Sequence, residues 1–165
     1  MSSKQDRDAL SRRDFVAVSV AAGLTSGAIP ATAAPAVAED EVSIKTADGI
    51  CDAAFIHPGS GAHPGVLIWP DAAGLRPSMR EIGRRLAAEG YAVLVPNPFY
   101  RIGKAPMYDS AANLDFADPA TRAKVGLLMG SVTVAGNAES DAAAYIAFLD
   151  AQAQVDKSKK IGVQG

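Results

Sequence analysis

Residues 66–101 read VLIWPDAAGLRPSMREIGRRLAAEGYAVLVPNPFYR, and this stretch decides the expected fold. Its two uninterrupted apolar runs, 66–69 and 91–95, are typical of strands that are covered on both faces. Between them, residues 78–88 place apolar side chains at helical spacing, with charged residues off that stripe. Pro77 stands near the first turn, where helices favour proline. A strand, a helix and a strand in this order predict a parallel βαβ unit with a right-handed crossover.

The sequence before this unit predicts a β-hairpin. Residues 41–46 alternate apolar and polar side chains, as a half-buried strand does, and residues 50–57 form a second predicted strand. The intervening residues 47–49, Ala-Asp-Gly, have turn chemistry. A loop rich in glycine and proline, 58–65, then leads into the βαβ unit.

The sequence after the unit predicts a long loop and a helix. Residues 97–118 show no clear period and are interpreted as loop. Asp118 and Pro119 are typical of an N-cap and a first helical position, so we expect a helix from there to about residue 129.

A further helix is expected over residues 138–151. The residues predicted on its buried face are Ala142, Tyr145, Ile146 and Leu149. After a linker at 155–159, residues 160–164 predict a third parallel strand of the same sheet.

Composition and charge exclude several classes of function. The chain has 165 residues, of which 48% are hydrophobic, a share that is normal for a globular domain. The formal net charge of −2 provides no basic field to bind nucleic acid. Because Cys51 is the one cysteine, the chain has no internal disulfide, no CxxC redox pair and no cysteine-rich zinc site.

The N-terminal residues have the features of an export signal. The stretch 15–29 carries no charge. It is shorter than the about 20 apolar residues of a membrane-spanning helix and fits the apolar core of a signal peptide. Just before it, Arg12, Arg13 and Phe15 belong to SRRDF, which resembles the S-R-R-x-F core of twin-arginine signals. The alternative interpretation is an ordinary arginine pair ahead of an apolar helix.

Two small-residue cleavage patterns of the A-x-A type follow, at 31–33 and at 36–38. Cleavage after the second defines residues 1–38 as the signal peptide and residues 39–165 as the mature domain. Twin-arginine signals serve proteins that are already folded. We therefore expect export through the twin-arginine translocation machinery to a periplasmic or extracellular location, with no stable membrane span after cleavage.

A parallel α/β sheet carries its ligand site at the carboxyl ends of its strands. Segments 70–74 and 96–101 and Gly165 are expected at that edge. Segment 74–77 leaves backbone N–H groups free ahead of the helix, where an anion or a developing oxyanion would be stabilised.

The stretch 66–101 resembles the dienelactone hydrolase family. The shared features are an acidic residue at the strand end, Asp71, followed by GLRP at 74–77, RLAAEGY at 85–91 and PNPFYR at 96–101. The resemblance covers roughly residues 42–165. It implies a three-layer α/β-hydrolase fold, here its N-terminal half, with an antiparallel hairpin and parallel βαβ units.

The resemblance also implies where the nucleophile lies. In that family, the strand corresponding to 160–164 continues into a G-x-C-x-G or G-x-S-x-G turn that carries the nucleophile. Gly165 matches the first glycine, so the Cys or Ser is expected two positions beyond the end of the chain. The acidic and histidine partners follow later still. We therefore expect a fragment truncated at the nucleophile elbow, without a catalytic triad and inactive alone.

Roles for four residues that are present follow from the same resemblance. The Ala72 backbone N–H corresponds to a donor of the oxyanion hole. Asp71 corresponds to the acidic position near the nucleophile, which is usually glutamate in dienelactone-cleaving members. Arg122 is the nearest candidate for the arginine that binds the substrate carboxylate, and its alternative place is a solvated helix face. Arg101 at the sheet edge is a further candidate that could equally be structural. The implied substrate is a small-molecule ester or lactone, with no cofactor and no metal.

Other interpretations of the same residues stay open. A noncatalytic ligand-binding or phospho-acceptor domain would use Asp71 as its reactive carboxylate, although no second acidic residue stands nearby to hold Mg²⁺. Asp71 could also cap the following helix, and the chain could be a complete flavodoxin-like domain. A dinucleotide-binding domain fits poorly, because the glycines of 59–65 precede the strand rather than follow it.

Three reactive side chains are assigned structural roles. His57 and His63 lie beside the loop that precedes the first parallel strand, at the amino end of the strands, so we expect them to be structural or to face solvent. Cys51 opens a strand of the hairpin, where a buried, small apolar role is expected.

Overall fold

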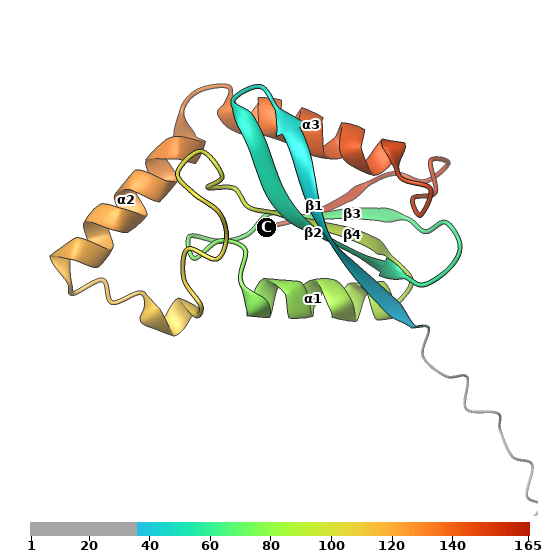
Figure 1. Cartoon of the computed structure of the whole chain (residues 1–165), viewed down its shortest axis with the longest axis horizontal. Coiled ribbons are helices and arrows are strands. Elements are labelled where there is room, and N and C mark those ends of the chain that lie inside the picture. Colours follow the sequence, from blue (N-terminus) through green and yellow to red (C-terminus); the bar gives the residue numbers. More distant parts are fainter. Residues whose placement is uncertain (1–35) are drawn as a thin grey trace, which may run out of the picture. The chain divides into compact units, whose positions relative to one another are not determined.

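A computed structural model describes residues 36–165, and Figure 1 shows their mixed α/β arrangement. Arg12, Arg13, Phe15 and the first A-x-A pattern lie outside the described residues. The elements in chain order are β1 (Val37–Thr46), β2 (Gly49–Pro58), β3 (Gly65–Ile68), α1 (Pro77–Ala88), β4 (Ala92–Pro96), the 3₁₀ turn η1 (Ala111–Asn113), α2 (Pro119–Thr133), α3 (Asn137–Ala151) and β5 (Gly162–Gln164).

The described strands form one sheet in the order β1-β2-β4-β3-β5. β1 pairs antiparallel with β2, from Val37 opposite Pro58 to Thr46 opposite Gly49, which confirms the predicted hairpin. β2 pairs antiparallel with β4, whereas β3 runs parallel to both β4 and β5. The predicted βαβ unit and the third parallel strand are therefore confirmed.

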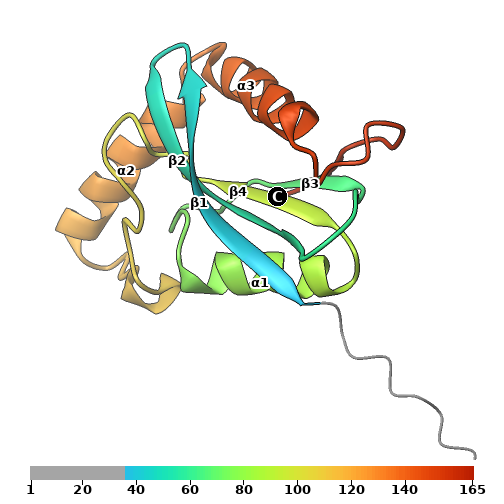
Figure 2. The ribbon, with the colours of Figure 1, turned by 45° about the vertical axis from the view of Figure 1, so that its right-hand side comes forward.

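Helix α1 covers one face of the sheet, as Figures 1 and 2 show. Ile56 and Val93 are fully buried on this face and pack with the partly buried Ile82 and Leu86 of α1. The helix approaches the sheet closely at Gly83, where a Cβ atom would lie 2.7 Å from Cδ1 of Ile56. Apolar burial of this kind stabilises a fold by about 1.5–3 kcal/mol per large side chain.

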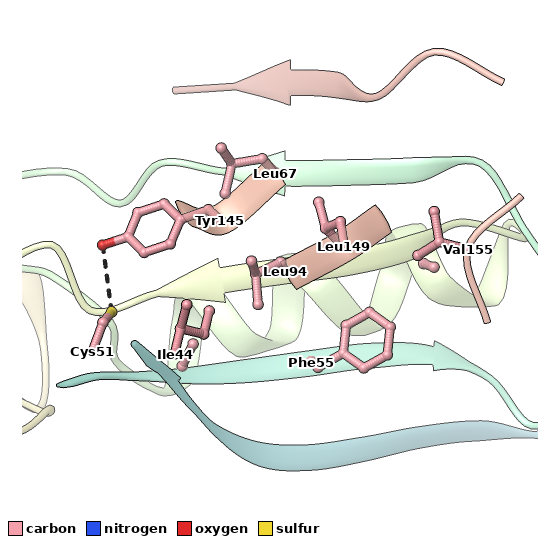
Figure 3. Close-up of a cluster of buried hydrophobic side chains, with 10 residues drawn as sticks. Ile44, Cys51, Phe55, Leu67, Leu94, Tyr145, Leu149 and Val155 are labelled. Carbon is pink, nitrogen blue, oxygen red and sulfur yellow. Dashed lines mark hydrogen bonds between the residues drawn. The ribbon is translucent and has the colours of Figure 1, made fainter. Parts of the chain in front are cut away.

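Helix α3 covers the opposite face, and Figure 3 shows the cluster beneath it. Phe55, Leu67 and Leu94 of the sheet are buried with Tyr145 and Leu149 of the helix. Helix α2 packs on α3 and lies beside the sheet rather than over it. The sheet with α1 and α3 therefore makes the three layers that the sequence predicted.

The buried face of α3 is rotated from the predicted one. Ile146 was expected in the core but is 38% exposed. Asp141 and Phe148 lie on the packed side instead, Asp141 fully buried and Phe148 against the cluster. The sequence pattern assigned the apolar Ile146 to the buried face and left Asp141 outside it. A carboxylate is buried only where a partner neutralises its charge, and the pattern shows no such partner.

Two elements are longer than predicted. β1 begins at Val37 rather than at residue 41, and α2 continues past residue 129 to Thr133. The hydroxyls of Ser131 and Thr133 donate to the carbonyls of Leu128 and Met129, which keeps the last turn of α2 hydrogen-bonded.

Candidate functional site at the carboxyl ends of β3 and β4

A small cleft lies where β3 and β4 end, as the sheet topology predicted. Its volume is about 110 Å³. The walls come from the segment after β3, the segment after β4 and the last turns of α2. The lining residues are Trp69, Pro70, Asp71, Ala72, Pro98, Phe99, Met129 and Val132. Except for Asp71, the side chains of this lining are uncharged and almost wholly apolar.

A second cleft lies on the other side of the same segment. Its volume is about 320 Å³, and it shares Trp69, Pro70 and Asp71 with the first. Its remaining lining comes from the end of β3, from α1 and from the C-terminal residues, namely Ile68, Met79, Ile82, Gln164 and Gly165. Trp69 and Asp71 therefore separate two hollows at the predicted edge of the sheet.

The turn after β3 is held by Asp71. Its backbone carbonyl accepts from the Gly74 N–H at 2.8 Å, and its Oδ1 accepts from the Ala73 N–H at 2.9 Å. Gly74 has φ +73, and a Cβ atom there would lie 3.0 Å from the Phe99 ring. Both the backbone angle and the lack of space require glycine at this position.

The Asp71 carboxylate is paired with Arg76. Nη1 of Arg76 donates to Oδ1 at 2.6 Å and Nη2 donates to Oδ2 at 2.9 Å, a two-pronged contact. Partial burial raises the pKa of Asp71, but the hydrogen bonds from Arg76 and Ala73 and the Arg76 charge outweigh it, so the pKa is lowered. Arg76 is also the residue before the first turn of α1. Asp71 therefore fixes the turn and does not cap α1.

The backbone N–H of Ala72 takes no part in the hydrogen bonds that hold this turn. The N–H groups of Ala73 and Gly74 are both bound to Asp71, whereas among residues 36–165 no acceptor is bound to the Ala72 N–H. Ala72 lines the first cleft. Of the three N–H groups at 72–74, that of Ala72 is thus the one left free beside the cleft, and a free backbone donor is the kind of group that an oxyanion hole uses.

The predicted arginines lie elsewhere. Arg122 is exposed at the start of α2, and its Nη1 donates to the carbonyls of Phe116 and Ala117. It is not among the residues that line either cleft. Arg101 is bound by the carboxylates of Asp48 and Asp141, so its charge is balanced within the fold.

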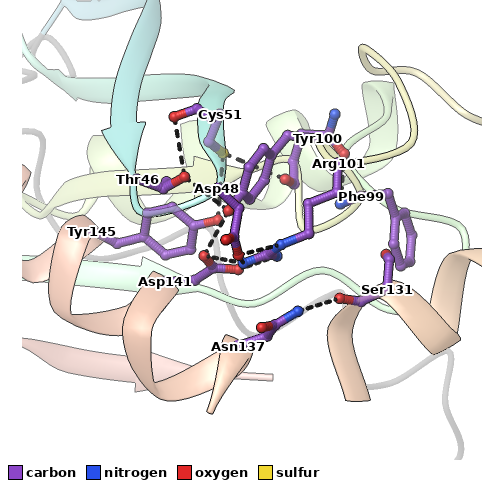
Figure 4. A network of polar contacts seen from close by, with 12 residues as sticks. Thr46, Asp48, Cys51, Phe99, Tyr100, Arg101, Ser131, Asn137, Asp141 and Tyr145 are labelled. Carbon is purple, nitrogen blue, oxygen red and sulfur yellow. Dashed lines mark hydrogen bonds and ion pairs between the residues drawn. The ribbon is translucent and has the colours of Figure 1, made fainter. Parts of the chain in front are cut away.

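Figure 4 shows the polar network around Arg101, which the sequence did not reveal. Asp141 has a side chain only 1% exposed. It accepts from Nη1 of Arg101 at 2.7 Å and from the Tyr100 hydroxyl at 2.8 Å, and that hydroxyl also accepts from Thr46. No local pattern signals it, because Tyr100 and Arg101 lie about 40 residues away from Asp141 in the chain.

Several groups in this region have raised pKa values, among them Tyr100 and Cys51. Burial raises the pKa of Tyr100 to about 12, and its hydrogen bond to the Asp141 carboxylate raises it as well. Burial also raises the pKa of Cys51 to about 11, against the hydrogen bond from the Tyr145 hydroxyl, which lies 3.4 Å from Sγ. Cys51 is fully buried, as predicted, and its thiol is held in the neutral, unreactive form.

The two histidines lie near the other end of β3, away from the clefts. Nδ1 of His57 is 2.8 Å from the Pro58 carbonyl, and its Nε2 is 3.3 Å from Asp40. Nε2 of His63 is 2.8 Å from the Ser60 carbonyl. Both rings therefore bind local groups, which agrees with the structural role expected for them.

Within residues 36–165, no group of three or more His, Cys, Asp or Glu side chains could hold a metal ion. In the same part of the chain, no helix has the length and hydropathy to cross a membrane.

Two solved structures are similar to this one. A dienelactone hydrolase-like promiscuous phosphotriesterase from metagenomic libraries matches with a TM-score of 0.59 and 28% identity, over 78% of this chain and 48% of that one. A protein named m3DLH matches with a TM-score of 0.58 and 25% identity, over the same shares. The sheet order, the helices on both faces and these matches define the N-terminal half of an α/β-hydrolase fold.

The sequence comparisons identify the family. A model of the dienelactone hydrolase family matches residues 51–165. The chain belongs to the dienelactone hydrolase family. A protein of Methylorubrum extorquens named "Putative carboxymethylenebutenolidase" is 32% identical over 102 residues, which are 57% of this chain and 35% of the relative. The chain thus spans about half the length of the two solved structures and about a third of this relative.

Proposed function

We propose that this chain supplies the oxyanion side of an active site that hydrolyses carboxylic esters or lactones. In this reaction a Cys or Ser nucleophile attacks the acyl carbonyl, and the carbonyl oxygen becomes negatively charged in the tetrahedral intermediate. The nucleophile comes from the sequence that follows Gly165 in the whole enzyme. Membership of the dienelactone hydrolase family supports this class of reaction.

The observation that carries the proposal is the free Ala72 N–H at the wall of an apolar cleft. A preorganised donor of this kind is worth about 3 kcal/mol of barrier in a water-poor site. Of the three backbone N–H groups at 72–74, those of Ala73 and Gly74 donate to Asp71. The third, that of Ala72, stays available to the substrate. The two hydrogen bonds from Arg76 favour the ionised form of Asp71 and hold its carboxylate against the turn.

The acyl group that suits the cleft is short and uncharged. A cleft of about 110 Å³ is smaller than the ~150 Å³ cavity that accommodates benzene in an engineered protein. No arginine or lysine is among the residues that line the cleft, and Arg76, which follows the same turn, is paired with Asp71. A substrate carboxylate would therefore find no free cation in the lining, and we propose neutral esters of short acids as substrates.

Binding of small esters tests this proposal without requiring turnover. The ¹⁵N-labelled chain is titrated with methyl butyrate, a neutral ester, and with monomethyl succinate, an ester of similar size that carries a carboxylate. Methyl butyrate is expected to shift the Ala72 amide and Trp69 indole signals, and monomethyl succinate to shift them much less. Val132→Glu, which places a charge in the lining, should abolish the shifts, whereas Val134→Glu is the exposed control on the residue that ends α2. Equal shifts with both esters would contradict the proposed substrate class.

We also propose that this chain alone lacks esterase activity. The 165-residue product is expected to hydrolyse p-nitrophenyl acetate no faster than buffer does. Sequencing of the gene downstream of codon 165 should show an open frame with Cys or Ser at the second codon. Turnover by the purified chain that is lost in Ala72→Pro but kept in Ala72→Gly would contradict this inactivity.

Export is the last part of the proposal. Arg12, Arg13 and Phe15 support recognition by the twin-arginine translocation machinery and a periplasmic or extracellular location. Fractionation of cells should recover the wild-type chain outside the cytoplasm. The double substitution Arg12→Lys with Arg13→Lys should retain it in the cytoplasm, and equal export of both would contradict the proposed route.

No described contact favours the phospho-acceptor alternative. Both carboxylate oxygens of Asp71 already accept hydrogen bonds from Arg76, and Oδ1 accepts a further one from Ala73. These contacts assign the carboxylate to holding the turn after β3.

A further inference from the structure

The second A-x-A pattern, residues 36–38, is part of the sheet. The Ala36 carbonyl accepts a hydrogen bond from the Gly59 N–H at 2.7 Å. Val37 lies opposite Pro58 and Ala38 lies opposite His57 in the β1–β2 ladder. The peptide bond that follows Ala38 is therefore inside a ten-residue paired strand.

The residues just after this bond are fastened by side chains. Glu39 accepts hydrogen bonds from Nη1 of Arg80 at 2.8 Å and from Nε of Arg84 at 2.7 Å. These two contacts bind this end of β1 to α1. Partial burial raises the pKa of Glu39, but the two arginines outweigh it and lower the pKa, so the carboxylate stays ionised and paired. Asp40 lies 3.3 Å from Nε2 of His57 on the neighbouring strand.

Proteases bind their substrates as extended segments through main-chain hydrogen bonds. In the folded chain, β2 already occupies one edge of residues 36–38, and the Glu39 contacts hold the following residue against α1. The bond after Ala38 can enter a protease cleft only if this end of β1 is first peeled from β2 and α1. A chain that is exported in the folded state meets the signal peptidase with β1 already paired.

We propose that the folded protein is processed before Ala36, at the 31–33 pattern, and that its mature N-terminus is Ala34 rather than Glu39. This inference rests on the proposed export, and it moves the boundary of the signal peptide from residue 38 to residue 33. The mature chain then keeps the whole of β1, including the Ala36 carbonyl bond to Gly59. The pairing of β1 thus favours the first of the two A-x-A patterns, although the sequence alone favoured the second.

Intact-mass measurement and N-terminal sequencing of the exported protein test this inference. The expected N-terminus is Ala34, and an N-terminus at Glu39 would overturn the proposal. Two matched variants place a larger, β-branched residue at the last position of each pattern. Ala38→Val, which suits a strand, should leave processing unchanged, and Ala33→Val should make the precursor accumulate. A product of Ala33→Val that begins at Glu39 would overturn the proposal as well.

A test with purified components measures the choice of cleavage site without requiring export. The purified, folded 165-residue chain and a synthetic peptide of residues 28–45 are each treated with signal peptidase. The folded chain should be cut only after Ala33, and the peptide, which has no β2 or α1 to pair with, should be cut after both Ala33 and Ala38. Cleavage of the folded chain after Ala38, or of the peptide only after Ala33, would show that the sheet does not make the choice. Loss of export in cells with correct cleavage in this test would contradict the export route alone.

Discussion

The α1 face of the sheet is closed by aliphatic side chains, whereas the α3 face places a carboxylate, a guanidinium, two phenols and a thiol near the core. The charged residues on the α1 side, such as Arg84, stay at the surface. On the α3 side, Asp141 is fully buried and depends on Arg101 and Tyr100. We therefore expect small substitutions on the α1 face to lower the free energy of unfolding only slightly. Removal of one partner from the buried polar network should lower it much more.

The largest effect is expected from breaking the network at its centre. Asp141→Ala leaves the Arg101 guanidinium largely buried and without its innermost partner, which costs about 3–5 kcal/mol when a buried pair is broken. Urea unfolding of the two chains measures this loss. Asp150→Ala, an exposed position on the same helix, is the control and should change stability by less than about 0.5 kcal/mol.

A pH effect should come from the same face. The folded pKa of Cys51 is about 11, raised from 9.0, so its stabilising contribution is complete below pH 9 and is lost as pH rises toward 11. This amounts to roughly 2–3 kcal/mol, because one pKa unit corresponds to about 1.4 kcal/mol. Unfolding free energies measured across this range should fall less steeply in Cys51→Ala than in the wild type. Parallel curves would show that the thiol is not the group responsible.

On the α1 face, the expected effects are smaller and depend on packing. Ile56→Val removes the Cδ1 atom that faces Gly83 and should cost about 1 kcal/mol. Gly83→Ala needs the space that this atom occupies. The double variant should therefore be more stable than the sum of the two single changes predicts, by roughly 0.5–1 kcal/mol. Strict additivity in urea unfolding would contradict the close contact between α1 and β2.

The smallest effect is expected at the surface of the α1 face. Glu39→Gln weakens the ion pairs with Arg80 and Arg84, and pairs of this partly exposed kind contribute about 0.2–1 kcal/mol. The loss should shrink further as salt is added, because screening weakens the charge contacts in the wild type. A loss of unfolding free energy as large as that of Asp141→Ala would contradict the proposed difference between the two faces.

The same contrast explains what the sequence could predict. The strands, α1 and the position of the site at residues 70–74 follow from local patterns, because apolar runs and helical spacing report directly on burial. The Asp141 network could not be predicted, since Arg101 and Thr46 reach it from distant parts of the chain. For the same reason the pattern selected Ile146 for the core, although the helix turns Asp141 inward.

The candidate site divides in a similar way. Asp71 and Ala72 were selected by the resemblance to the dienelactone hydrolase family, and the structure places both at the cleft wall. The partner that engages Asp71, Arg76, was not anticipated, because the contact depends on how the turn at Gly74 folds back. Val132 was missed because the helix from Pro119 was expected to end at about residue 129, before the turn that completes the cleft.

Trp69 borders both clefts and is the one tryptophan in the chain. Its indole fluorescence therefore reports on this edge of the sheet with no background from other tryptophans. A shift in its emission wavelength or intensity on adding a ligand, a quencher or a complementing polypeptide would therefore report binding beside Asp71 in either hollow.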